Sequence, residues 1–144
     1  MICPTHGGEL MERYPIILDD ENAGQIRIVY VRRDAADPER LRAWFDSLDC
    51  DCVEHVRTMI PGIALLVDES GKMKEPQKPL NSKASRLYPG TFYGDPIVGH
   101  AIICSIGYRN GEPDIVPPTD DALRKLSRLT GWKIPGLPMF EDDL

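Results

Sequence analysis

Two apolar segments, at residues 63–67 and 97–106, constrain the fold more than any other feature of the sequence. Each is rich in Ile and Val and is preceded by Gly or Pro, a pattern typical of a strand buried in a sheet. The 72–93 segment between them is polar and contains three prolines. Loops of this length are uncommon inside a compact domain and are usually functional or disordered. We therefore interpret the two segments as scaffold and the loop as the candidate functional segment.

The strand pattern continues outside these two segments. Residues 25–31 alternate and are rich in β-branched side chains, residues 53–58 form a second short run, and residues 114–116 are placed to pair as another strand. These runs predict a small mixed, mostly antiparallel sheet.

Two helices are predicted beside the sheet. Residues 37–39 combine an acceptor side chain at the N-cap, proline at the first helical position and an acid in the first turn. Apolar side chains follow at helical spacing up to Leu48. A second helix starts at Thr119 and ends at Gly131. With the sheet, these helices predict the α+β class.

Length and composition limit the number of domains and the classes of partner that the chain can have. At 144 residues, one domain is expected, at residues 25–131, with an N-terminal arm at 1–24 and a C-terminal tail at 132–144. The net charge of -6 argues against a nucleic-acid partner, because Lys and Arg supply most of that affinity. No apolar run approaches the roughly 20 residues that cross a bilayer, so no membrane partner is predicted. The absence of a secretory signal pattern predicts a cytoplasmic location.

A family resemblance covers residues 25–129. The segments that carry it are 63–72, Leu80-Asn81, Ala84-Ser85, Leu87-Tyr88, 95–99 and 123–129. In these segments the chain is similar to the domain of unknown function 3846 family, which occurs in bacteria, phages and mobile elements. The resemblance implies a small α+β domain with an accessory role in phage or plasmid biology, sometimes beside antirestriction genes, and it implies no reaction.

The polar loop has the composition of a site for a small polar or phosphorylated ligand. Lys and Arg supply charge, Ser and Asn orient hydrogen bonds, and Tyr offers a stacking face. The candidate ligand-binding residues are Asn81, Lys83, Ser85, Arg86, Tyr88 and Asp95. The alternative is that Asn81 and Asp95 cap turns and satisfy the backbone of the loop itself.

No cofactor is predicted, and the alternative is a zinc site. Zinc prefers four N or S ligands in a tetrahedron, commonly as two closely spaced pairs. Cys3, His6, Cys50 and Cys52 could supply them if the arm folds back onto the end of the first helix. A second constellation, His100 with Cys104 on one predicted strand, resembles an activated nucleophile. Because Cys104 lies in an apolar run, a structural role is favoured and no catalytic residue is predicted.

The sequence contains no Walker loop, nucleophile elbow or zinc-protease helix, so an enzyme is not the favoured interpretation. The leading hypothesis is a noncatalytic accessory protein of a phage or mobile element that binds a host protein or a small signalling ligand, with counter-defence as one such role. The alternatives are a small zinc-containing structural or interaction module, and an enzyme acting on a nucleotide through Lys83, Arg86 and His100. The sequence does not define the oligomeric state.

Overall fold

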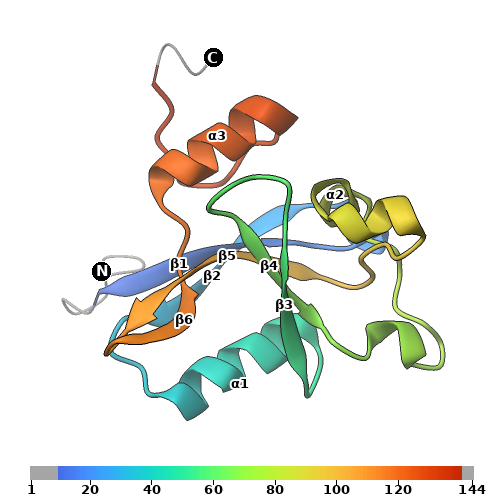
Figure 1. Cartoon of the computed structure of the whole chain (residues 1–144), viewed down its shortest axis with the longest axis horizontal. Helices are drawn as coiled ribbons and strands as arrows, with labels where there is room; N and C mark the ends of the chain where they lie inside the picture. The colour runs from blue at the N-terminus through green and yellow to red at the C-terminus, as the bar shows by residue number, and fades with distance from the viewer. Residues whose placement is uncertain (1–9, 141–144) are drawn as a thin grey trace.

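The computed structural model describes residues 10–140, and within this range all strand pairings are antiparallel. The six-stranded sheet has the order β2-β1-β5-β4-β3, with β6 paired to β5 (Figure 1). This confirms the predicted α+β class with a mostly antiparallel sheet in a single small domain. The strands are β1 (Met11–Ile17), β2 (Ile26–Arg32), β3 (Val53–Arg57), β4 (Ala64–Asp68), β5 (Ala101–Arg109) and β6 (Glu112–Val116).

Helices cover both faces of the sheet. In Figure 1, α1 (Asp37–Leu48) lies on one side, whereas α2 (Ser82–Leu87) and α3 (Asp120–Thr130) lie on the other. The described residues also form three short 3-10 segments: η2 (Asp20–Asn22), η3 (Gly71–Met73) and η4 (Pro89–Tyr93). None of the helices in the described range combines the length and apolar character that a membrane span requires.

The sheet separates two hydrophobic clusters. Alternate side chains of a strand point to opposite faces. In β4, Ala64 and Leu66 accordingly join the cluster under α1, while Leu65 and Val67 join the cluster under α2 and α3. The inner strands β4 and β5 are apolar on both faces, which is why residues 63–67 formed a continuous apolar run in the sequence.

The predicted N-terminal arm is corrected by the structure from Met11 onward. β1 pairs with β2 along its whole length, from Met11 opposite Arg32 to Ile17 opposite Ile26, and with β5 at Ile16 and Ile17. Pro15 lies outside the pairing with β5, so its missing N–H removes no bond to that strand.

The predicted tail also contributes to the core. Trp132 and Ile134 are buried in the cluster under α3, so the first residues of the 132–144 segment belong to the domain. A side-chain contact fixes the same segment to the sheet, because Arg13 Nη2 donates a 3.0 Å hydrogen bond to the carbonyl oxygen of Pro135.

The loop between β4 and β5 holds a helix that the sequence did not predict, so the described chain has three helices rather than two. α2 has six residues, and Asn81 caps it by accepting a 3.0 Å hydrogen bond from the N–H of Ala84. Two turns of helix are too short to show a periodic apolar face. The last predicted helix is confirmed: Thr119 caps α3, and Gly131 ends it in a left-handed conformation.

Two lysines of the same loop fasten it to the end of α1. Lys78 Nζ donates to the carbonyl oxygens of Leu48 and Asp49 at 2.7 Å each and lies 2.9 Å from Asp68 Oδ2. Lys74 Nζ lies 2.7 Å from the same carboxylate oxygen. Ammonium groups at the C-terminus of a helix satisfy its last carbonyls and complement its dipole. The contacts therefore join α1, β4 and the loop.

Acid should weaken this junction. Burial alone would raise the pKa of Asp68, but hydrogen bonds from Lys74 and Lys78 outweigh it and lower the pKa from 3.8 to about 2. A carboxyl group whose pKa is lowered in the folded protein stabilises the fold fully at pH values above its ordinary pKa. This stabilisation disappears as the pH falls toward the lowered pKa. We expect Asp68→Asn to be less stable than the wild-type protein above about pH 4. Between about pH 4 and about pH 2 it should lose less stability than the wild-type protein does. Denaturant unfolding across this range, with Asp46→Asn as an exposed control, checks it. Parallel curves for wild type and Asp68→Asn would contradict it.

Candidate functional site

Two of the predicted ligand-binding residues, Asn81 and Ser85, are engaged with backbone groups of the protein itself. Asn81 Nδ2 donates to the carbonyl oxygens of Ile17 and Gly99, both at 2.9 Å, while its Oδ1 caps α2. Ser85 Oγ accepts from the N–H of Ile97 at 2.9 Å. Both side chains are buried. Their polar groups hold β1, α2 and the start of β5 together.

The other four predicted residues do not converge on one point. Tyr88 Oη donates to Asp95 Oδ2 at 3.3 Å, and Asp95 also pairs with Lys72 beside a depression of about 150 Å³. Lys83 Nζ lies instead 5.7 Å from the ring centroid of Trp132, and Arg86 is exposed. The structure thus brings Tyr88 and Asp95 together and leaves the two cations elsewhere.

The zinc alternative is only partly covered by the structure. Cys3 and His6 lie outside the described residues. Within residues 10–140, no group of three or more His, Cys, Asp or Glu side chains is arranged to hold a metal. Cys52 is exposed and donates to the carboxylate of Glu69, a hydrogen bond that raises the pKa of its thiol to about 11. Because zinc binds the thiolate, this contact opposes metal binding at Cys52.

The candidate nucleophile pair of His100 and Cys104 is occupied in other ways: Cys104 is buried, and His100 contacts the backbone. Cys104 is fully buried, and burial raises the pKa of its thiol to about 12. His100 Nδ1 accepts a 3.1 Å hydrogen bond from the backbone N–H of Asp19. A thiol with so high a pKa is a poor nucleophile.

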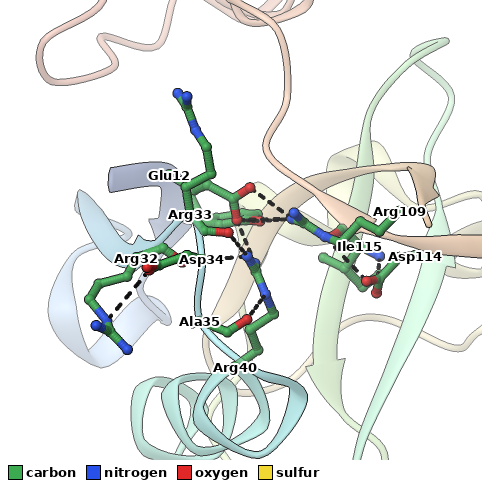
Figure 2. Close-up of polar contacts among 10 residues, drawn as sticks. Glu12, Arg32, Arg33, Asp34, Ala35, Arg40, Arg109, Asp114 and Ile115 are labelled. Carbon is green, nitrogen blue, oxygen red and sulfur yellow. Dashed lines mark hydrogen bonds and ion pairs between the residues drawn. The ribbon is translucent and has the colours of Figure 1, made fainter. Parts of the chain in front are cut away.

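A buried ion-pair network that the sequence did not reveal lies on the α1 side of the sheet. Figure 2 shows Arg40 from α1 and Arg109 from β5 converging on Glu12 from β1. Arg40 Nη1 lies 2.5 Å from Glu12 Oε1, and Arg109 Nη2 lies 2.8 Å from Glu12 Oε2. Tyr14 Oη donates a further 2.8 Å hydrogen bond to Glu12. The side chains of Glu12 and Arg40 are each only 7% exposed.

Both guanidinium groups also bind backbone carbonyls. Arg40 Nε donates to Ala35 at 3.1 Å and its Nη2 donates to Arg33 at 2.6 Å, so it fixes the connection between β2 and α1. Arg109 Nη2 donates to Ile115 at 3.1 Å across the β5–β6 hairpin. The network therefore joins β1, β5, β6 and the start of α1.

The network also shifts the titration of its members. Burial would raise the pKa of Glu12, but hydrogen bonds from Arg40 and Arg109 outweigh it and hold the pKa below its ordinary value. Burial and the hydrogen bond to Glu12 raise the pKa of Tyr14. Glu12 is thus a fixed carboxylate, poorly suited to exchange protons with a substrate near neutral pH.

A groove of about 890 Å³ opens beside this network. The helix α1, about 10 Å wide, crosses a sheet whose five consecutive strands span about 20 Å. A single helix therefore leaves part of this face uncovered, and the groove lies between α1 and the β5–β6 hairpin. Its larger apolar side chains come from α1 and three strands: Leu41, Trp44, Val53, Leu66 and Ile115.

The β5–β6 hairpin forms a well-defined wall of the groove. Asn110 and Gly111 both have positive φ, 52° and 81°, and connect the two strands directly. A two-residue turn of this kind suits Asn-Gly and matches the twist of the strands. It places Arg109 opposite Glu112 at the end of the ladder.

The polar lining of the groove contains four carboxylates and three guanidinium groups. Arg40 and Arg109 are the two already bound to Glu12, and Arg33 is exposed. The carboxylates are those of Asp34, Asp37, Glu112 and Asp114. The groove thus combines an apolar floor with an acidic rim.

Sequence patterns contained signals for the network. Glu12 alternates with the buried Tyr14 and Ile16, and Arg40 lies four residues before the buried Trp44. A charged residue in register with an apolar stripe indicates a buried ion pair. No pattern, however, indicated that these two residues would meet.

Comparison with known proteins gives a similarity of fold. No family model matches the chain, and no curated protein matches it. The crystal structure of small RNA methyltransferase HEN1 is similar, with a TM-score of 0.52 and 19% sequence identity over 86% of this chain. The match spans only 17% of that protein's chain. The resemblance to the domain of unknown function 3846 family stays a prediction.

Proposed function

We propose that this chain is a noncatalytic binding protein that receives its partner in the groove between α1 and the β5–β6 hairpin. The observation that carries the proposal is a groove whose apolar side chains reach solvent at Leu41, Val53 and Ile115, beside walls fixed by a buried network. Preformed concave sites are typical of binding sites, and this one combines apolar side chains with charged groups that the buried network holds in place. The locked carboxylate of Glu12 favours binding over acid–base catalysis.

The biological setting is also part of the proposal. On the family resemblance, the chain acts in the cytoplasm as an accessory protein of a phage or mobile element. Its partner is a host protein or a small signalling ligand, and counter-defence is one role that such binding would serve. Membranes and nucleic acids are not proposed as partners.

Two leucine variants test the groove as the binding surface. Leu41 lines the groove and is 44% exposed, whereas Leu129 is 65% exposed on α3, on the opposite side of the sheet. Leu41→Lys introduces a charge into the apolar wall and should abolish capture of the specific partner from host lysate. Leu129→Lys makes the same change elsewhere and should leave capture intact. Circular dichroism and thermal unfolding establish that both variants are folded. Equal capture by both variants would contradict the proposal.

A further inference from the structure

Two of the three arginines of the groove, Arg40 and Arg109, have little capacity left for an anionic ligand, while the third, Arg33, is exposed at its edge. All three nitrogens of Arg40 donate to Glu12 or to backbone carbonyls. Arg109 is held by Glu12, by the carbonyl oxygen of Ile115, and by Asp114, whose Oδ2 lies 3.2 Å from Arg109 Nε. A phosphate or carboxylate would have to displace these partners, and separating a buried ion pair is strongly unfavourable. The network thus acts as a support for the groove.

The acidic rim, in contrast, has two carboxylates that are open to solvent. Asp37, in the first turn of α1, and Glu112, at the start of β6, are both exposed. Neither carboxylate has a hydrogen-bond or ion-pair partner among residues 10–140. They border the groove from its two opposite walls, one from the helix and one from the hairpin. A ligand in the groove could meet both carboxylates at once.

The floor between the two walls is apolar. Trp44 and Leu66 are already buried at its base, at 4% and 2% exposed. The apolar surface that a ligand can still bury comes from Leu41, which is 44% exposed, and from the half-buried Val53 and Ile115. Burying apolar surface contributes about 25 cal/mol per Å². Exposed charges mainly improve association rate and specificity. A ligand that uses both features needs cationic groups and apolar groups on the same segment.

We infer, on the basis of the proposed function, that the groove binds a basic amphipathic segment of a partner protein. Its Lys or Arg side chains pair with Asp37 and Glu112, and its apolar side chains lie on Leu41, Val53 and Ile115. The two open carboxylates, Asp37 and Glu112, outnumber the exposed guanidinium of Arg33, so charge complementarity favours this occupant over an acidic or phosphorylated one. An amphipathic segment in an apolar groove is a recurring mode of peptide recognition.

Three synthetic peptides of about 14 residues test the inference by fluorescence anisotropy in roughly 0.1 M salt. The first has leucine on one helical face and lysine on the other, the second replaces lysine with glutamate, and the third replaces leucine with serine. We expect the Lys/Leu peptide to bind the wild-type protein and the other two to bind at least about tenfold more weakly. The Glu/Leu peptide binding as tightly would overturn the charge assignment. The Lys/Ser peptide binding as tightly would overturn the role of the apolar floor.

A charge-reversal variant with a matched control locates the binding. Asp37→Lys with Glu112→Lys should weaken the Lys/Leu peptide about tenfold or more. The control, Asp120→Lys with Glu21→Lys, alters exposed acids outside the groove, including one in the first turn of α3. It should bind like wild type. Equal affinity for both double variants would show nonspecific attraction and overturn the inference.

The outcome also separates this inference from the proposed function. If no peptide binds, but the protein captures a partner and Leu41→Lys abolishes this capture, the inference of a basic segment is wrong. The groove then remains the binding surface. Capture that is insensitive to Leu41→Lys defeats the proposed function itself. A homodimer that Leu41→Lys dissociates would identify a second copy as the occupant and would also overturn the inference.

Discussion

Replacing Arg40 by Ala should lower the free energy of unfolding by about 3–5 kcal/mol, the range observed when one partner of a buried ion pair is removed. Its side chain is 7% exposed, and its loss leaves a buried carboxylate at Glu12 with one guanidinium fewer. The backbone carbonyls of Arg33 and Ala35 also lose their donors. The junction between β2 and α1 should therefore weaken together with the core.

Arg42→Ala is the matched control for this prediction. Arg42 lies on the same helix and is exposed, so its removal should change stability by no more than about 0.5 kcal/mol. Urea unfolding of the two variants and wild type gives the comparison. If Arg40→Ala were as stable as Arg42→Ala, the network would not be the support of the groove.

Replacing Asn81 by Ala should lower the free energy of unfolding by about 2–5 kcal/mol, since it removes a helix cap and takes a side-chain donor away from two buried carbonyls. These carbonyls belong to Ile17 at the end of β1 and Gly99 before β5. The side chain is fully buried, so water cannot replace its hydrogen bonds.

Thr119→Ala provides the comparison, because Thr119 caps α3 and makes no second contact of this kind. Loss of such a cap alone lowers stability by about 0.5–2 kcal/mol. In thermal and urea unfolding, Asn81→Ala should have a clearly lower free energy of unfolding than Thr119→Ala. Equal losses would mean that the two carbonyl contacts contribute nothing, and Asn81 would return as a ligand-binding candidate.

Local patterns predicted the parts of the fold that depend on neighbouring residues. The boundaries of α3 were predicted because Thr119 and Gly131 are strong local signals for its start and end. The inner strand β4 was predicted because both of its faces are apolar. β1 was missed because Pro15 and the surrounding Gly and Asp residues obscured its alternation.

The groove depends on contacts that local patterns do not contain. Glu12 is separated by 28 residues from Arg40 and by 97 from Arg109 in the sequence, and only the order of strands brings them together. The loop was predicted to be a binding site from the types of its polar side chains. Residue type, however, does not specify the direction in which a side chain points. In the fold, Asn81 points into the core and Lys83 lies over Trp132.

Photo-cross-linking from position 41 tests the central claim most directly. A photoreactive amino acid in place of Leu41 places the probe on the groove wall, and the same residue in place of Leu129 places it on α3. We predict a specific cross-linked partner from position 41, none from position 129, and a weaker product when Asp37 and Glu112 are changed to Lys. The same partner cross-linked from position 129, with none from position 41, would contradict the groove as the binding surface.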